Sequence, residues 1–153
     1  MQKITTFLWF DGQTEEAMRF YVSLFKNSRI VSTTPGPDGK VLTGTFELDG
    51  QRFMALNGGP QYKFTEAISL FVNCETQAEI DELWSKLTAN GGAESMCGWL
   101  KDRYGVSWQI IPSVLGKLFG DKDRAKAGRA MQAMLQMKKL DIAKLQRAFD
   151  GTA

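Results

Sequence analysis

The choice of possible catalytic residues in this chain is narrow, because none of its 153 residues is histidine. That absence removes the commonest general base, the imidazole that most often binds metals, and any Ser-His-Asp triad. Two cysteines are present, Cys74 and Cys97, without a C-x-x-C spacing. Cys97 could act as a nucleophile only if a neighbouring cation activated it, and inert packing of a small thiol is the favoured alternative. We therefore assign no catalytic residue.

Gln109 is the most informative polar residue, because it lies in the apolar, strand-like run Val106–Pro112. A polar side chain in such a strand needs a hydrogen-bond partner, a ligand or water if it is buried. The run follows Asp102–Gly105, whose polar-to-glycine composition is typical of a hairpin loop. Two interpretations stay open for Gln109, namely contact with a ligand and a hydrogen bond that completes the packing.

The elements that must position Gln109 belong to an internal repeat. The order strand, helix and three strands occurs twice, at a spacing of about sixty residues. The first copy comprises strands at Ile4–Phe10, Arg29–Thr34, Val41–Leu48 and Arg52–Leu56, with a helix N-capped by Thr14. The second comprises a strand at Ala67–Asn73, a helix with the capping box Thr76–Glu79, a short strand near 93–96 and the hairpin.

This order predicts an α+β fold. Two βαβββ modules, at about residues 1–60 and 61–112, would form one domain over residues 1–112. Residues 113–153 are predicted to be helical throughout and to pack on that domain as a C-terminal extension. Asp121 or Asp123 is expected to cap one of these helices and Asp141 the last.

Four segments resemble one superfamily. They are Phe10–Tyr21 (FDGQTEEAMRFY), Phe71–Gly92, Cys97–Pro112 (CGWLKDRYGVSWQIIP) and Ala133–Phe149. Together and in this order they are similar to the vicinal oxygen chelate superfamily of glyoxalases, bleomycin-resistance proteins and dioxygenases. Within it they resemble the PhnB-like group, which carries the label demethylubiquinone methyltransferase. The resemblance implies a cupped, mostly antiparallel sheet around a cleft, and a homodimer.

The superfamily's metal ligands are not matched in this chain. The resemblance places the four ligand positions at Thr5 or Thr6, at or near Ala55, at Ala67 and at Gln109. Alanine cannot bind a metal, and one glutamine with one threonine cannot hold Zn²⁺ or Fe²⁺. We therefore expect neither a metal nor another cofactor.

Strand alternation divides the two faces of the sheet. If Thr5 and Gln109 face the cleft, the same face receives a set of aromatic and neutral polar side chains. With Cys97 from the hairpin, the candidate ligand-binding residues are Thr5, Phe7, Trp9, Asn57, Ser69, Phe71, Cys97, Ser107 and Gln109. The opposite face, which helices would cover, receives Ile4, Thr6, Leu8, Ile68, Leu70, Val72, Val106, Trp108 and Ile110. Trp9 should thus line the cleft, while Trp108 packs beneath a helix.

These observations favour a protein that binds a small, partly aromatic or apolar molecule without a metal. The alternative is a metal-independent enzyme of the same fold, including the methyltransferase of the family label. No glycine-rich loop in a strand–loop–helix context supports an S-adenosylmethionine site.

Charge and composition bound the partners of the chain. A net charge of +2 gives no reason to expect nucleic acid or a membrane surface as a partner. The absence of a signal-like segment and the two cysteines favour a cytoplasmic protein.

Overall fold

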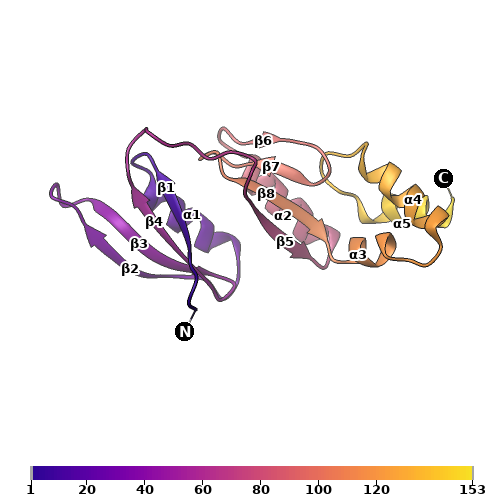
Figure 1. Cartoon of the computed structure of the whole chain (residues 1–153), viewed down its shortest axis with the longest axis horizontal. Coiled ribbons are helices and arrows are strands. Elements are labelled where there is room, and N and C mark those ends of the chain that lie inside the picture. Colours follow the sequence, from indigo (N-terminus) through magenta and orange to yellow (C-terminus); the bar gives the residue numbers. More distant parts are fainter. Residues whose placement is uncertain (1, 153) are drawn as a thin grey trace. The chain divides into compact units, whose positions relative to one another are not determined.

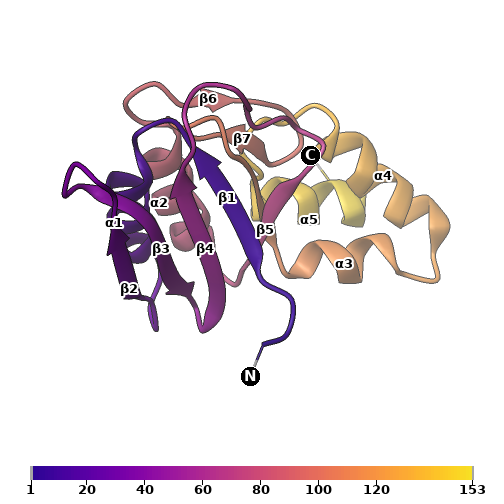
Figure 2. The same cartoon turned by 60° about the vertical axis from the view of Figure 1, so that its left-hand side comes forward.

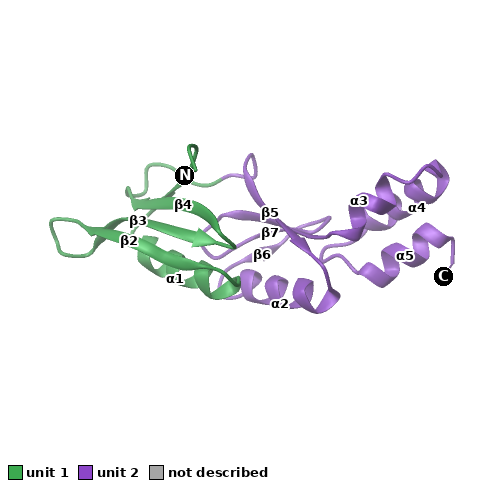
Figure 3. Ribbon diagram, turned by 90° about the horizontal axis from the view of Figure 1, so that it is seen from below, with its two compact units in different colours: residues 1–64 green, residues 65–153 purple. Residues whose placement is uncertain are grey.

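The computed structural model describes residues 2–152, which form two compact units that divide between residues 64 and 65. Each unit contains one four-stranded mixed sheet with a helix packed on it (Figures 1 and 3). The predicted α+β class and the two βαβββ modules are confirmed.

The first unit holds β1 (Thr6–Phe10), α1 (Thr14–Leu24), β2 (Arg29–Pro35), β3 (Val41–Leu48) and β4 (Gln51–Asn57). Its strand order is β1-β4-β3-β2, in which β1 runs parallel to β4 and the other pairs are antiparallel. Helix α1 lies against this sheet (Figure 2). Beneath it lie apolar side chains such as Leu8, Phe46 and Phe53, so burial of this face stabilises the unit.

The second unit repeats that topology. It holds β5 (Ser69–Cys74), α2 (Gln77–Thr88), β6 (Ala93–Glu94), β7 (Trp99–Lys101) and β8 (Ser107–Pro112), in the order β5-β8-β7-β6. β5 runs parallel to β8, and the hairpin β7–β8 is antiparallel. The equivalent topology confirms the internal repeat. The N-cap predicted at Thr76 is present, because the Thr76 hydroxyl accepts a hydrogen bond from the Glu79 backbone N–H.

Three further helices complete the second unit: α3 (Val114–Phe119), α4 (Arg124–Met134) and α5 (Ile142–Asp150). Asp123 caps α4 and Asp141 caps α5, each through its carboxylate. Figure 2 shows the three helices gathered together. A buried cluster of Leu115, Leu118, Ala130, Leu140 and Leu145 holds them, and Ile111 of β8 joins this cluster to the sheet.

The first helix begins differently from the prediction. Thr14 is not the N-cap; Gln13 occupies that position, and its side chain makes no capping hydrogen bond. Asn57, at the end of β4, instead accepts a hydrogen bond from the Thr14 N–H at 2.9 Å through its Oδ1. A local sequence rule cannot find a cap that comes from a strand more than forty residues away.

The positions predicted for Ile4 and Ile68 are also wrong. Both were expected on the helix-covered faces, yet they are 87% and 61% exposed. The strands begin at Thr6 and Ser69, so both isoleucines precede the region in which alternation of faces applies.

Among residues 2–152, no helix combines the length and the apolar character needed to cross a membrane.

Candidate functional site

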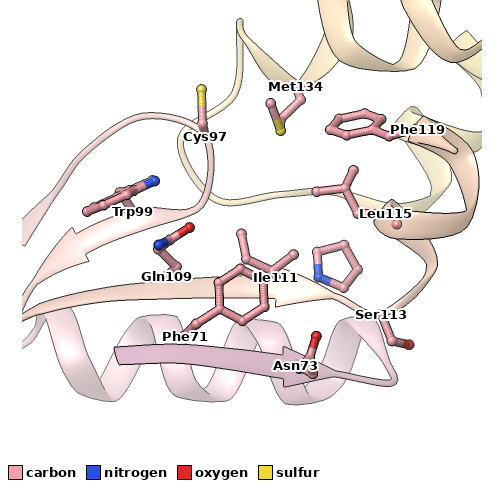
Figure 4. Close-up of a pocket in the computed structure, with 12 residues that line it drawn as sticks. Phe71, Asn73, Cys97, Trp99, Gln109, Ile111, Ser113, Leu115, Phe119 and Met134 are labelled. Carbon is pink, nitrogen blue, oxygen red and sulfur yellow. The ribbon is translucent and has the colours of Figure 1, made fainter. Parts of the chain in front are cut away.

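A cavity lies on the face of the second sheet that α2 does not cover, where β8 leads into α3 (Figure 4). Its volume is about 340 Å³, near the lower end of the roughly 300–1,000 Å³ range of small-molecule pockets. Twelve residues line it: Phe71, Asn73, Cys97, Trp99, Gln109, Ile111, Pro112, Ser113, Leu115, Gly116, Phe119 and Met134.

The walls of the cavity come from two sources. One wall is the sheet, which contributes Phe71 from β5 and Trp99 from β7. The other wall is the C-terminal extension, which contributes Leu115 and Phe119 from α3 and Met134 from α4. Phe71 is 53% exposed although it is a large aromatic residue. An aromatic ring open to a concave surface favours contact with an apolar ligand.

Gln109 supplies a polar group within this apolar surface. Its Nε2 donates a hydrogen bond to the Ser69 Oγ at 2.9 Å, across the parallel pair β5–β8. Figure 4 shows its amide oxygen on the side that faces the cavity. The Ser69 contact therefore holds the amide in one orientation, with its acceptor open to a bound molecule.

Cys97 reaches the cavity through an unusual backbone conformation. Its φ of 61° is in the left-handed region, and the following Gly98 has a φ of 85°. The Cys97 N–H donates to the Met137 carbonyl at 2.7 Å, and the Gly98 N–H donates to the Lys138 carbonyl at 2.8 Å. A Cβ at position 98 would lie 3.0 Å from the Ile110 carbonyl oxygen, so glycine is needed there.

The other cysteine is in a different environment. Cys74 is fully buried, and burial raises the pKa of its thiol to about 12, with a contribution from the neighbouring Glu79. A protonated, buried thiol is neither a good nucleophile nor a metal ligand.

The described lining of the cavity is without charged side chains. None of the described residues that line the cavity is Asp, Glu, Lys or Arg. Within residues 2–152, no group of three or more Cys, Asp or Glu side chains is placed to hold a metal ion. The polar groups of the described lining are thus neutral amides, a hydroxyl, a thiol and an indole.

Three of the predicted ligand-binding residues, Phe71, Cys97 and Gln109, meet at this cavity. Ser69 lies behind Gln109 as its hydrogen-bond partner. Ser107 is only 1% exposed and does not line the cavity. The other four candidates, Thr5, Phe7, Trp9 and Asn57, belong to the first unit.

In the first unit, strand alternation places Phe7 and Trp9 on the face away from α1. Phe7 is 50% exposed, whereas its neighbour Leu8 is buried. Trp9 donates a hydrogen bond from its Nε1 to the Gly59 carbonyl at 2.9 Å, and its ring meets Tyr62 edge-on at 4.9 Å. The segment after β4 thus folds over Trp9 and covers part of this face.

Asn57 and Ala55 correct the predicted division of faces in β4. Ala55 and Phe53 are buried, whereas Met54 and Leu56 between them are partly exposed. Asn57 shares the parity of Ala55, and both ends of its amide are engaged, by the Thr14 N–H and the Val41 carbonyl. Asn57 was expected on the open face, but it pairs directly with the buried Phe10 of β1, so strand alternation places it on the helix-covered side.

Sequence reasoning missed the part of the site that comes from the extension. Leu115, Phe119 and Met134 are ordinary apolar helix residues, and no local pattern separates a cavity wall from a core contact. Trp99 could have been predicted as a site residue from the sequence, because the hairpin pairs it directly with Gln109. Pairing across the turn at Asp102–Gly105 would have placed the two side chains on one face.

Comparison with known proteins identifies the family of this chain. The model of the 3-demethylubiquinone-9 3-methyltransferase family matches residues 2–111. The PhnB protein from Bacillus cereus, which carries a provisional label of the same methyltransferase, is 45% identical. The match covers 73% of this chain and 100% of that protein, with a TM-score of 0.69. The C-terminal extension lies beyond the family match.

More distant structures share the fold alone. A glyoxalase-related enzyme from Fulvimarina pelagi is 17% identical over 75% of this chain and 91% of its own, with a TM-score of 0.52. The fosfomycin resistance protein FosX from Listeria monocytogenes is 12% identical over 76% of this chain and 97% of its own, with a TM-score of 0.55. No curated protein matches the chain. The chain therefore belongs to the PhnB-like, 3-demethylubiquinone-9 3-methyltransferase family, which has the glyoxalase, bleomycin-resistance and dioxygenase fold.

Proposed function

We propose that this protein binds a small, uncharged and partly aromatic molecule in the cavity of its second unit. The observation that carries the proposal is the cavity itself, which joins the exposed ring of Phe71 to apolar side chains of the extension around Gln109. Burial of apolar ligand surface would supply most of the affinity, at about 25 cal/mol per Å² before the costs of association. No metal takes part.

Native mass spectrometry of the freshly purified protein tests this proposal. The expected result is a mass increment from a co-purified small molecule, which disappears on denaturation. Phe119→Ala removes an aromatic wall of the cavity and should lower ligand occupancy. Phe25→Ala is the matched control, because Phe25 lies in the first unit at the end of α1. Equal occupancy in all three proteins would contradict the proposed site.

A second candidate function is the methyltransferase activity in the family label, which the match over residues 2–111 favours. That reaction needs a methyl donor such as S-adenosylmethionine. Gly58 and Gly59 follow β4, Gly91 and Gly92 follow α2, and Gly105 lies in a hairpin turn, so none forms a strand–loop–helix phosphate or nucleotide motif. Calorimetric titration with S-adenosylmethionine separates the two candidates, and we expect no saturable heat.

The assembly and location proposed for the protein follow from its surface and composition. We propose a homodimer, with one domain at residues 1–112 and the helices of residues 113–153 packed on it. We also propose a cytoplasmic location, in which both free cysteines stay reduced, and neither nucleic acid nor a membrane as a partner.

A further inference from the structure

Trp99 and Gln109 present one hydrogen-bond donor and one acceptor along the wall of the cavity. They are direct partners in the antiparallel register of β7 and β8, so their side chains lie on the same face. Both line the cavity. Figure 4 shows the indole nitrogen of Trp99 and the amide oxygen of Gln109 directed toward the space that the extension encloses.

Neither group is used within the protein. The Nε2 group of Gln109 donates its hydrogen bond to Ser69. No residue from 2 to 152 donates a hydrogen bond to the Gln109 Oε1. Over the same residues, the Trp99 indole N–H has no hydrogen-bond acceptor. The indole can only donate and the amide oxygen can only accept. Polar groups at an apolar cavity lose water when a ligand enters, so each must be satisfied by that ligand.

We infer that the cavity recognises an aromatic molecule through one neutral hydroxyl group. A hydroxyl oxygen accepts one hydrogen bond and its proton supplies another. It would accept from Trp99 Nε1 and donate to Gln109 Oε1, while the ring lies against Phe71, Leu115 and Phe119. This inference rests on the proposed function and adds the chemical class of the ligand.

The absence of charged side chains from the described lining also limits the chemical class of the ligand. No basic residue lines the cavity, so a carboxylate or phosphate would lose its hydration without a counter-charge. A neutral aromatic alcohol or phenol satisfies both polar groups and the apolar walls at once. A hydrocarbon of the same size would leave the indole N–H and the amide oxygen unpaired.

Three probes of nearly equal size test the inference: 1-naphthol, 1-methoxynaphthalene and 1-methylnaphthalene. The first can donate and accept, the second can only accept, and the third can do neither. Binding to the full chain is followed by quenching of tryptophan fluorescence and confirmed by calorimetry. We expect 1-naphthol to bind about fivefold or more tightly than the methoxy compound, the size of effect that one buried hydrogen bond produces.

Gln109→Met keeps the side-chain length and removes the acceptor. It should bring 1-naphthol down to the affinity of 1-methoxynaphthalene and leave the methyl compound unchanged or tighter. Gln132→Met is the matched control, because Gln132 is exposed on α4 and does not line the cavity. The control should retain the full preference for the hydroxyl.

The outcomes separate the two proposals. Saturable binding of all three probes with equal affinity to the unmodified protein would overturn the hydroxyl inference and leave the binding function standing. A preference for 1-naphthol that survives in Gln109→Met would also overturn it. If no probe binds and no co-purified molecule is found, the proposed function itself fails. The comparison of probes on the unmodified protein needs no variant to fold.

Discussion

At the scale of single residues, Trp108 and Trp9 are the same residue type but differ in how deeply they are buried. Trp108 is 1% exposed, and its Nε1 donates to Asp102 Oδ2 at 2.9 Å. Asp102 is itself buried and also accepts from the backbone N–H groups of Tyr104 and Val106, which fixes the hairpin turn. Trp9 is only half-buried and packs on the segment after β4. Trp108 is therefore integral to the core.

We predict that Trp108→Ala destabilises the protein by about 3–5 kcal/mol, the cost of removing a buried aromatic residue. Trp9→Ala should cost less, because part of its surface already contacts water. Urea unfolding of both variants measures the difference. Trp108→Phe is the control that keeps a ring and removes the indole N–H. If Trp9→Ala is the more destabilising variant, the assignment of the covered face in β1 or β8 is wrong.

The two thiols should differ in reactivity. Because burial raises the pKa of Cys74 to about 12 and removes it from solvent, we predict that it does not react with a thiol reagent at pH 8 in the folded protein. Cys97 is partly exposed at the cavity and should react. The expected titre is one thiol per folded chain and two after denaturation. Cys97→Ser should abolish the fast reaction, and a titre that persists in this variant would refute the assignment.

The same pKa shift has a consequence for stability against pH. The folded state holds the Cys74 proton up to about pH 12, whereas the usual value for the thiol is 9.0. The stabilisation from this group is thus complete below pH 9 and is lost as the pH rises toward 12. Cys74→Ala should weaken the decline of unfolding free energy with alkaline pH, as measured by urea unfolding at increasing pH.

At the scale of elements, Gln77 connects α2 to the C-terminal extension. Its Nε2 donates to the Leu140 carbonyl at 3.0 Å, and its Oε1 accepts from the Ile142 N–H at 2.8 Å. The Lys139–Asp81 ion pair at 2.8 Å lies in the same region but is exposed on both sides. A glutamine that satisfies two backbone groups at the start of α5 contributes more than an exposed ion pair.

We predict that Gln77→Ala loosens the extension and costs about 1–2 kcal/mol, because two backbone groups lose their partner. Hydrogen exchange should become faster in residues 138–145. Gln146→Ala is the matched control, since among residues 2–152 the Gln146 side chain bonds only to the exposed Asp150 within α5. Unchanged protection in Gln77→Ala would show that the apolar cluster alone holds the extension.

At the scale of the whole molecule, the residues at the superfamily's ligand positions determine the expected metal content. We predict no stoichiometric transition metal, because the four positions that the superfamily resemblance assigns to ligands carry Thr5, Ala55, Ala67 and Gln109. Elemental analysis of the purified protein is the measurement. One Zn²⁺, Ni²⁺, Mn²⁺ or Fe²⁺ per chain, removable together with ligand binding, would refute the metal-free proposal.

We also predict a dimer, with a mass twice the 17.1 kDa of one chain. Phe7 is 50% exposed on the face of the first sheet that α1 leaves open. Met54 and Leu56 of the neighbouring β4 lie on the same face and are partly exposed. Apolar side chains on an open sheet face favour association with a second copy. Light scattering at micromolar concentration measures the mass. Phe7→Lys should shift it toward that of one chain, whereas Lys3→Glu, which changes an exposed charge, should not.

The sequence by itself determined most of the elements. Strand alternation in β1 and β8, the N-cap at Thr76 and the turn at Asp102–Gly105 depend on residues close together in the chain. These local patterns were sufficient for the α+β class, for the repeated βαβββ order and for the burial of Trp108. The resemblance carried by the motifs was sufficient for the family.

Only the tertiary structure decided the site. The capping of α1 by Asn57, the pairing of β4 with β1 and the cavity walls from α3 and α4 all join segments that are distant in sequence. Such contacts depend on how whole elements pack, and a helix residue such as Phe119 has the same local pattern in a core or in a cavity wall. Trp99 and Gln109 are paired by the hairpin, but they line a cavity only because the helices of the extension pack in front of them.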